Sequence, residues 1–474
     1  MKLTPEEQRQ KEIARLQKEK AKPKMRGYMA YFFLIISIIY LADEIVSQLP
    51  SQTSTILASQ IFAPIVGEEF AIARMSAVAM IPGLLAMLNL VYRPLSDKYG
   101  RKIFLVVNTI GMGVATIVIG ASTGIPAYCV GLFLTQFFIP NDMQAVYLQE
   151  CAPPEHRGKM YSAVKFIATL GMLLVPILRQ IFIPTADMSN WRYIYYVPGI
   201  IAIIAGIASA LLIRESDAFV DSRLRVLTMT EEEKAAAKAK KQNVDDKGGL
   251  GKAFKIAFSS KQVLWLIIAG CLLKSGGNIT SSYESIISNG YAQQFVNSGM
   301  DLTAARAEAA VFVTKALMLF SVGSAFLQLI PGFIADKFGR KASVTAMSAF
   351  TIVFYLLFHF GCEGAWNPYL VGFFCGAAIG SFWAVGDMAQ LMVSESVPTN
   401  VRASVITIYP LLANMGRMVS GILLTVLINI MGDSSLGIVT LLSAVPLMVI
   451  GLFAMLKVKE TNGVDLGAIR GDEF

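Results

Sequence analysis

The sequence predicts an all-α membrane protein, with twelve transmembrane helices in two pseudo-symmetric six-helix bundles. Of its 474 residues, 55% are hydrophobic and only 16% are charged, whereas roughly a quarter of a soluble domain is charged. Apolar runs such as 194–213 and 438–456 approach the ~20 residues that cross ~30 Å of hydrocarbon. Two sequence motifs also recur in the same order in both halves. A soluble protein would leave most of these runs without a polar face, so we exclude that class.

Apolar stretches define six predicted spans in each half. The spans of the first half are 28–50, 73–95, 102–121, 125–149, 159–184 and 192–213. The spans of the second half are 262–288, 309–331, 342–361, 367–393, 403–430 and 436–457.

These spans divide the chain into five parts. We expect a cytoplasmic N-terminal amphipathic segment (1–27), an N-terminal six-helix bundle (28–213), a cytoplasmic central loop with helices (214–261), a C-terminal six-helix bundle (262–457) and a cytoplasmic tail (458–474). In the first segment, Thr4, Pro5 and Glu7 mark a capped helix start. In the central loop, a second capped helix is predicted from Thr230 to about Asp245.

Basic residues concentrate in alternate loops. By the positive-inside rule, this pattern puts both termini and the central loop in the cytoplasm, so the net charge of +8 reflects topology and no nucleic-acid partner is expected. A bacterial-type inner (plasma) membrane is favoured, because no signal peptide, glycosylated first loop or disulfide spacing is visible. The basic loop residues include Arg93, Lys98, Arg101, Lys102, Arg157, Lys159, Lys337, Arg340 and Lys341.

Motifs for catalysis or for metal binding are missing from the sequence. The five cysteines lack metal-ligand spacing and are interpreted as small packing residues. Neither histidine, His156 or His359, has a nucleophile beside it, and no phosphate-binding loop is visible. We therefore expect no enzyme activity, no cofactor and no bound metal.

Two internal repeats relate the halves. The segment from Ser96 to Lys102 follows the second span, and the similar segment from Ala335 to Lys341 follows the eighth. A second set, Asp142-Met143, Glu150 and Arg157, recurs with the same internal spacing as Asp387-Met388, Glu395 and Arg402. The chain is therefore predicted to be a duplicated six-helix unit.

With these motifs the sequence resembles the major facilitator superfamily over essentially its whole length. The hallmark of that family is Gly-x-x-x-Asp-[Arg/Lys]-x-Gly-Arg-[Arg/Lys] after the second helix, often echoed after the eighth. Residues 332–341 match it completely, while the first copy has Arg93 at the leading glycine.

Within the superfamily, the chain looks most like the sugar porter and organic-ion porter branches. Residues 154–158 and 398–402 resemble their Pro-Glu-x-x-Arg-Gly loop and its echo, and residues 275–278 with Tyr283 resemble the sugar porters' Ser-Gly-x-Asn-x-x-x-x-Tyr stretch. The glutamine pair of the sugar porters is replaced by Leu272 and Leu273. This replacement disfavours simple hexose recognition.

Charges in the loops are predicted to form a gating latch. The alternative is that these loop charges only reflect the positive-inside rule. That rule explains basic residues in cytoplasmic loops, but it does not explain why acidic residues recur at the same positions in both halves. Opposite charges at helix ends would hold the inward gate closed and separate when it opens. The gating residues are Asp97, Arg101, Glu150, Arg157, Asp336, Arg340, Glu395 and Arg402.

Charged side chains inside the membrane are costly and mark candidate sites. Lys274 and Arg417 lie about halfway along their spans and suit an anionic ligand, since an arginine can bind a carboxylate in a bidentate manner. The alternative is pairing with Glu284 or Asp387. Lys165, a further charge within a span, also belongs to the predicted substrate-binding set. The set is completed by Asn278, Tyr283, Gln136, Asn141 and Trp383, for which simple packing is the alternative role.

The adjacent acids Asp43 and Glu44 are the candidates for proton coupling. Neighbouring carboxylates in a low dielectric repel each other, so that one of them can load and release a proton. The alternative is that they pair with a basic residue such as Lys165 or Arg417.

Together these features predict a secondary active importer of a small organic anion, such as a carboxylate or sugar acid, by proton-coupled symport and alternating access. Neutral sugar uptake is the first alternative, a drug or metabolite exporter the second, and a non-transporting sensor the third. We expect a monomer whose partners are the bilayer, the substrate and protons.

Overall fold

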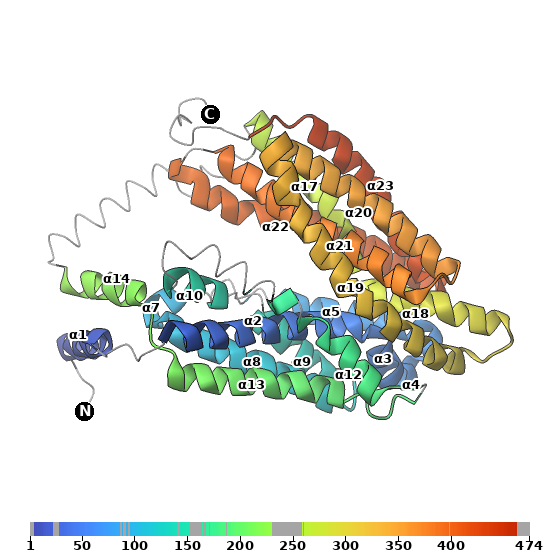
Figure 1. Cartoon of the computed structure of the whole chain (residues 1–474), viewed down its shortest axis with the longest axis horizontal. Coiled ribbons are helices and arrows are strands. Elements are labelled where there is room, and N and C mark those ends of the chain that lie inside the picture. The colour runs from blue at the N-terminus through green and yellow to red at the C-terminus, as the bar shows by residue number, and fades with distance from the viewer. Residues whose placement is uncertain are drawn as a thin grey trace. The chain divides into compact units, whose positions relative to one another are not determined.

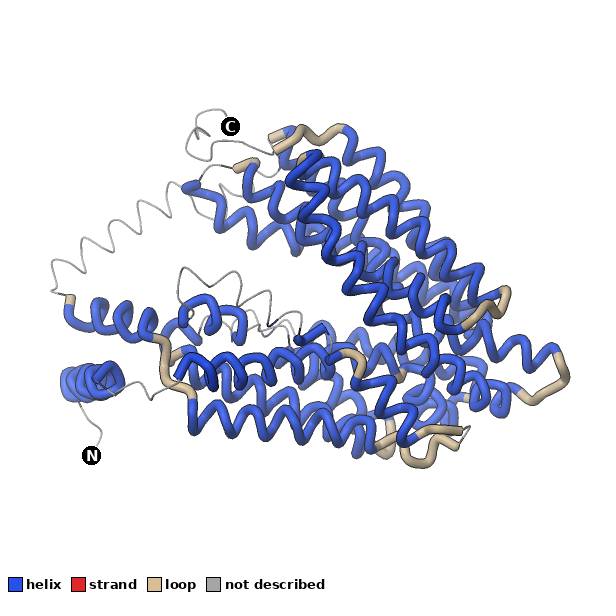
Figure 2. The backbone as a smooth tube through the Cα atoms, in the orientation of Figure 1, coloured by secondary structure: helices blue, strands red, loops and turns tan. Residues whose placement is uncertain are grey.

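In the computed structural model, the described part of the chain consists of helices joined by loops and turns (Figure 2). It describes residues 4–21, 28–85, 88, 92, 95–139, 143–151, 164, 167–169, 171–185, 187–229, 258, 260–397 and 399–461. The chain forms two compact units. The first unit comprises Met1–Pro50, Val78–Phe182 and Ser189–Lys238, and the second comprises Ser51–Ala77, Ile183–Met188 and Ala239–Phe474.

The first unit is built from helices of the first half of the chain (Figure 1). Two helices, α2 and α5, begin in one unit and end in the other. The helices with residues in this unit are α1 (Pro5–Ala21), α2 (Tyr28–Gln52), α5 (Ala71–Leu85), α7 (Ser96–Tyr99), α8 (Arg101–Ala121), α9 (Ile125–Phe138), α10 (Met143–Cys151), α12 (Leu174–Phe182), α13 (Tyr193–Leu212) and α14 (Asp217–Thr228).

The second unit contains the second half of the chain together with the connection between α2 and α5. Its long helices are α17 (Lys261–Lys274), α18 (Ile279–Asn297), α19 (Leu302–Phe338), α20 (Arg340–Glu363), α21 (Pro368–Glu395), α22 (Thr399–Met431) and α23 (Leu436–Leu456). Its short elements are α3 (Ser54–Leu57), η1 (Ala58–Phe62), α4 (Ala63–Val66), η2 (Glu68–Phe70), η6 (Ser275–Asn278) and η7 (Asp433–Ser435).

Within the described ranges, nine helical stretches are long and apolar enough to cross a membrane. Shorter apolar helices lie at Ser54–Val66, Ile125–Phe138 and Ile167–Phe182. Predicted spans 262–288 and 309–331 are shorter than the helical stretches Lys261–Asn297 and Leu302–Phe338. The ends of these helices are set by caps rather than by hydropathy. At Leu302, for example, the Asp301 carboxylate accepts a hydrogen bond from the Thr303 N–H at 3.0 Å.

Small residues let neighbouring helices of the second unit approach closely. A Cβ on Gly372 would lie 1.8 Å from the Ala316 carbonyl oxygen, and one on Gly376 would lie 1.9 Å from that of Phe320. These contacts pack α21 directly against the backbone of α19. Close backbone packing of this kind supplies van der Waals contact where lipid removes most of the hydrophobic driving force.

The polar segments agree in part with the sequence predictions. Helix α1 begins as predicted, with the Glu7 carboxylate accepting from the Thr4 N–H at 2.7 Å and the Thr4 hydroxyl accepting from the Glu7 N–H at 3.3 Å. An unpredicted helix, α14, follows α13, and Leu16 of α1 is buried against Phe219 and Val220 of α14. The predicted helix over 230–245 lies outside the described residues.

Candidate functional site

The seventh span is interrupted near its middle. Helix α17 ends at Lys274, the four residues of η6 form a 3₁₀ turn, and α18 continues from Ile279. Every residue of η6 is buried. Breaks of this kind are tolerated within a membrane where they are buried in protein or line a cavity, and they recur at transporter binding sites.

Hydrogen bonds join the break to α22 and α23. The Asn278 side-chain N–H donates to the Ser420 hydroxyl at 2.8 Å, and that hydroxyl donates to the Ser275 carbonyl at 2.8 Å. The Ser275 hydroxyl lies 3.2 Å from the Ala444 carbonyl. The amide nitrogen of Asn278 therefore holds helices together, and the predicted role of Asn278 in substrate binding stays a prediction.

Lys274 lies half-buried beside the break. Its Nζ is 5.0 Å from the centroid of the Phe382 ring, a distance suited to a cation–π contact. Asp387 attracts its charge and Arg417 repels it. Among the residues that the structure describes, no carboxylate lies within ion-pair distance of Lys274.

The alternative in which Glu284 neutralises Lys274 is wrong. The Glu284 carboxylate is fully buried and accepts hydrogen bonds from the Ser54 hydroxyl at 2.8 Å, the Thr55 N–H at 2.7 Å and the Thr55 hydroxyl at 2.6 Å. These donors belong to α3, a segment far from Glu284 in sequence. Sequence spacing alone therefore did not reveal them.

Arg417 occupies the middle of α22, on the side that meets the break. Its methylene stem packs on Gly277, where a Cβ would lie 2.8 Å from the arginine Cδ. The side chain is exposed. Within the described part of the chain, its guanidinium has neither a hydrogen-bond nor an ion-pair partner. The donors of this group are thus available to a ligand.

Three other predicted substrate-binding residues differ in how deeply they are buried in the protein. The Tyr283 ring is fully buried and stacks on Phe320, with centroids 4.7 Å apart and an angle of 4° between the planes. Trp383 and Gln136 are half-buried, in α21 and α9. The roles of all three in substrate binding stay predictions.

The coupling candidates lie on α2, where Asp43 is buried and Glu44 is half-buried. Both take part in polar or electrostatic interactions. Asn141, Arg157 and Lys165 lie outside the described residues. For Asp97, Asp336 and Arg402 only the helical backbone is described.

The two predicted ion pairs at the helix ends are present. In the first unit the Arg101 Nε lies 3.0 Å from a Glu150 oxygen, and in the second the Arg340 Nε lies 3.6 Å from a Glu395 oxygen. Each pair joins helices of its own unit, α8 to α10 and α20 to α21. Their role as a gate stays a prediction.

Two further acids, not predicted from the sequence, repeat the same arrangement in both units. One Glu215 oxygen accepts the N–H groups of Arg101 at 3.0 Å and Lys102 at 2.9 Å, which caps α8. Glu460 accepts those of Arg340 at 2.8 Å and Lys341 at 3.1 Å, which caps α20. The available sequence signal was the Glu-Ser or Glu-Thr pair that follows the last span of each half, but its capping role was not predicted.

The capping acid of the first unit is electrostatically perturbed. Burial raises the pKa of the Glu215 carboxyl, although the hydrogen bonds from the backbone of Lys102, Ser216 and Arg101 act in the opposite direction. The carboxyl is therefore a mostly desolvated group that its donors hold in place.

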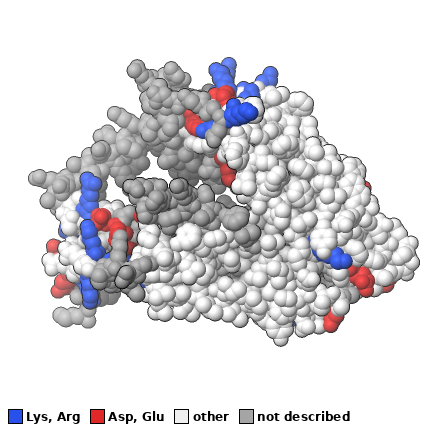
Figure 3. Space-filling view, in the orientation of Figure 1, with Lys and Arg blue, Asp and Glu red and all other residues white. Residues whose placement is uncertain are grey.

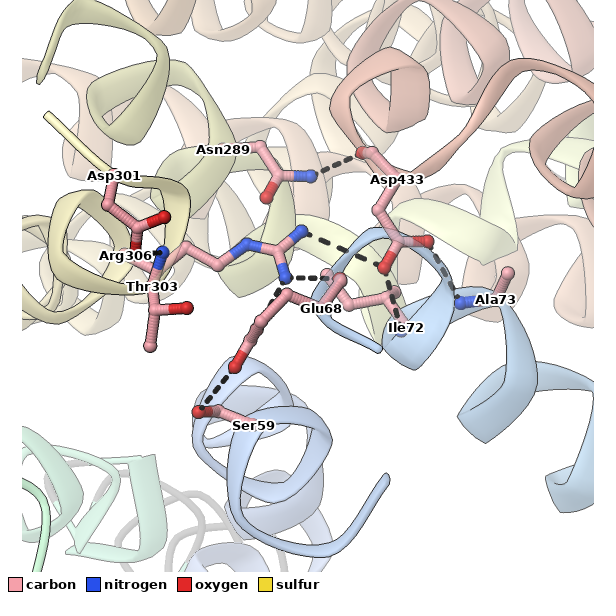
Figure 4. Close-up of polar contacts among 9 residues, drawn as sticks. All are labelled: Ser59, Glu68, Ile72, Ala73, Asn289, Asp301, Thr303, Arg306 and Asp433. Atoms are coloured by element: carbon pink, nitrogen blue, oxygen red, sulfur yellow. Dashed lines mark hydrogen bonds and ion pairs between the residues drawn. The ribbon is translucent and has the colours of Figure 1, made fainter. Parts of the chain in front are cut away.

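The second unit also contains a charge cluster that was not predicted, formed by Arg306 of α19, Glu68 of η2 and Asp433 of η7 (Figure 4). Arg306 donates to the Glu68 carboxylate at 2.8 Å and lies 3.7 Å from Asp433, which is fully buried. The Asp433 carboxylate also accepts the N–H groups of Ile72 at 2.8 Å and Ala73 at 3.1 Å. Asp433 therefore caps the start of α5, and Arg306 links it to η2. From sequence, an acid in a short turn between two apolar spans was the available signal.

Comparisons with known proteins agree with the sequence resemblance. A family model described as sugar (and other) transporter matches residues 70–469. The glucose transporter GlcP of Staphylococcus epidermidis is 24% identical over 367 residues, which cover 70% of this chain and 74% of the relative. The putative metabolite transport protein YwtG of Bacillus subtilis is 24% identical over 411 residues, covering 80% of this chain and 82% of that protein.

Solved structures show the same fold. The crystal structure of a D-xylose–proton symporter is similar with a TM-score of 0.65 and 16% sequence identity, over 92% of this chain and 99% of that chain. The nucleoside transporter NupG is similar with a TM-score of 0.60 and 15% identity, over 90% of this chain and 99% of that one. The predicted fold class is therefore confirmed. With the family model matching both halves, the chain belongs to the sugar porter family of the major facilitator superfamily, and it is a multi-pass membrane transporter rather than an enzyme.

Proposed function

We propose that this transporter takes up a neutral sugar by proton-coupled symport and alternating access. The observation that carries the proposal is the family match over residues 70–469, which covers nearly both halves of the chain. The names of two similar proteins, a glucose transporter and a D-xylose–proton symporter, point to the same substrate class. Neutral sugar uptake therefore replaces organic-anion import as the leading hypothesis for the function.

The break in the seventh span supplies the substrate-binding region of this proposal. Lys274 directly precedes η6 and the Arg417 stem packs on Gly277 within it, so that the donors of both side chains can bind sugar hydroxyls near the break. Hydroxyl groups accept hydrogen bonds from a charged donor without requiring a countercharge on the ligand. Leu272 and Leu273 stand where sugar porters carry glutamines, so Lys274 is the main polar side chain of α17 near the break, and Arg417 approaches it from α22.

A sugar acid is the second candidate substrate. The observation that favours it is the pair of cations itself, because neither Lys274 nor Arg417 forms an ion pair with any acid that the structure describes. A carboxylate on the substrate would neutralise them and accept two parallel hydrogen bonds from the arginine.

Proton coupling and topology complete the proposal. Asp43 and Glu44 on α2 remain the coupling candidates, since adjacent carboxyls in a poorly solvated helix favour keeping a proton on one of them. The basic loops favour cytoplasmic termini in a bacterial-type inner membrane. The two six-helix halves, 28–213 and 262–457, are the proposed moving bodies.

The test is uptake into proteoliposomes of labelled glucose, xylose, gluconate and glucuronate, with and without an inward proton gradient. We expect gradient-stimulated uptake of a neutral sugar, and a loss of at least 10-fold in Arg417→Ala and Lys274→Met. The matched control is Lys315→Met, which removes an exposed cation of α19 that packs over Phe312 and leaves uptake unchanged. Uptake of the acids alone would select the second candidate. Uptake of none, by folded protein, would contradict both.

A further inference from the structure

The first unit contains a pocket to which the proposed transport function assigns no role. It has a volume of about 690 Å³ and lies between α1, α14 and the Arg101 end of α8. This volume falls within the usual range of small-molecule pockets, about 300–1,000 Å³. Its lining residues come from the described part of the first unit alone.

One wall of the pocket is basic. Gln8, Lys11, Glu12 and Arg15 are spaced three and four residues apart, so they share one face of α1. Glu12 is already paired with Arg223 of α14 at 2.9 Å. Lys11 and Arg15 are exposed and have no acid partner among the described residues, which leaves two positive charges at the rim. In the space-filling view, basic and acidic side chains lie together over α1 and α14 (Figure 3).

The opposite wall is apolar and belongs to a membrane-spanning helix. Ile103 and Val107 of α8 line the pocket and remain 53% and 43% exposed. Val114, two turns further along α8, is 42% exposed. The wall therefore continues into an exposed apolar stripe of a helix that crosses the membrane. Tyr99, which also lines the pocket, is exposed, and aromatic side chains of this kind commonly mark the lipid headgroup region.

We propose that this pocket binds one anionic phospholipid. Lys11 and Arg15 bind its phosphate and acidic headgroup, and its acyl chains lie along Ile103 and Val107. A soluble phosphate ester would contact the two cations but not the apolar wall, whereas the headgroup and acyl chains of a phospholipid contact both walls. Binding there would attach the α1–α14 pair to the membrane surface through charge and apolar contact together.

The experiment measures lipid retention by the full-length protein purified in detergent. Phosphatidylglycerol or phosphatidylcholine is titrated, and bound lipid is counted by native mass spectrometry for the wild type and for Lys11→Gln/Arg15→Gln. We expect the wild type to retain one phosphatidylglycerol tightly and the double variant to bind it about 10- to 30-fold more weakly, as two surface cations contribute. The control is Lys18→Gln/Arg225→Gln, which removes the same charge from α1 and α14 outside the pocket and should retain the lipid as the wild type does.

A second arm tests the apolar wall and a third the soluble alternative. Val107→Trp should displace the phosphatidylglycerol, while Val130→Trp, at an exposed site on α9, should not. Glycerol 3-phosphate at millimolar concentration should leave the bound lipid in place. Equal retention of both lipids, equal loss in the control, or displacement by glycerol 3-phosphate would each overturn the proposal. Circular dichroism of every variant confirms that the compared proteins are folded.

Discussion

At the scale of single residues, the loop after the second span depends on a glycine that no other residue replaces well. Gly100 has φ = +119°, and a Cβ there would lie 2.4 Å from a Glu215 oxygen. Its counterpart Gly339 has φ = +97°, and a Cβ would lie 2.4 Å from Glu460. Backbone strain and a displaced helix cap therefore coincide at each position.

We predict that Gly100→Ala lowers the free energy of unfolding by about 2–4 kcal/mol, since strain of about 1–3 kcal/mol adds to a weakened cap. The matched control is Gly67→Ala, where φ is +84° but no atom lies within 4 Å of the added Cβ. Unfolding in mixed micelles measures both. Equal losses in the two variants would show that the contact with Glu215 contributes nothing.

A second prediction at this scale concerns the charge of Glu215. All three of its backbone donors, on Arg101, Lys102 and Ser216, bond to one oxygen. A glutamine carbonyl can accept the same bonds, so Glu215→Gln should cost no stability, while Glu215→Ala should lose about 1–3 kcal/mol by leaving the donors unpaired. The measurement is the free energy of unfolding at pH 6.

The pH dependence has a definite sign. Because burial raises the folded-state pKa of Glu215 above its ordinary 4.5, the folded protein holds the proton more tightly than the unfolded chain. This contribution to stability is fully present below pH 4.5 and is lost as the pH rises through the folded-state pKa. Glu215→Gln should therefore gain stability relative to wild type over that rise, and a difference that stays flat with pH would contradict the expectation.

At the scale of elements, the Arg306 cluster holds the α2–α5 connection on the second unit. The guanidinium is mostly buried, as are its partner acids Glu68 and Asp433. Removing one member of such a network leaves a desolvated charge without its counterpart, which costs more than the pair contributes. The Asp433 hydrogen bonds to the start of α5 would remain.

We predict that Arg306→Met lowers the free energy of unfolding by about 3–5 kcal/mol. The control, Asp301→Ala, removes an exposed helix cap five residues away and should cost about 1 kcal/mol. If the two variants are equally stable, the cluster is an incidental surface network.

At the scale of the whole molecule, the same connection bears on alternating access. Ser54 follows the first span of the chain, yet its hydroxyl lies 2.7 Å from that of Ser285 on α18. Ser54 and Ser285 both belong to the second unit. If 28–213 moves as one body, as proposed, their contact must open during each cycle.

A cross-link should therefore stop transport. In Ser54→Cys/Ser285→Cys, oxidation should form a disulfide and reduce uptake by at least 10-fold, and a reductant should restore it. Each single cysteine variant controls for the five native cysteines, which are free in the structure. Unchanged uptake by protein shown to be cross-linked would show that the Ser54–Ser285 contact does not open and that 28–213 does not move as one body.

Much of the fold was predictable, because each helix that crosses a membrane requires a long apolar stretch that is easily recognised in the sequence. The spans and the duplicated motifs depend on residue type and spacing alone, and they sufficed to identify the fold and the family. The Arg101–Glu150 and Arg340–Glu395 pairs were also predictable, since the repeat conserved their spacing across the two halves. The ends of the helices were less predictable, because a capping residue such as Asp301 starts a helix outside its apolar stretch.

The sequence by itself thus determined the membrane class, the twelve-helix architecture and the placement of Lys274 and Arg417 within spans. Only the tertiary structure decided what those charges contact. Glu284 was a plausible partner for Lys274 by depth, but the structure gives it to Ser54 and Thr55, more than two hundred residues away. Arg417 is left without a described partner. The physical reason is that the polarity of a residue, and so its tendency to lie within the membrane, follows from its type alone. A hydrogen bond depends on the distance between two groups, which is set by the packing of helices that are far apart in sequence.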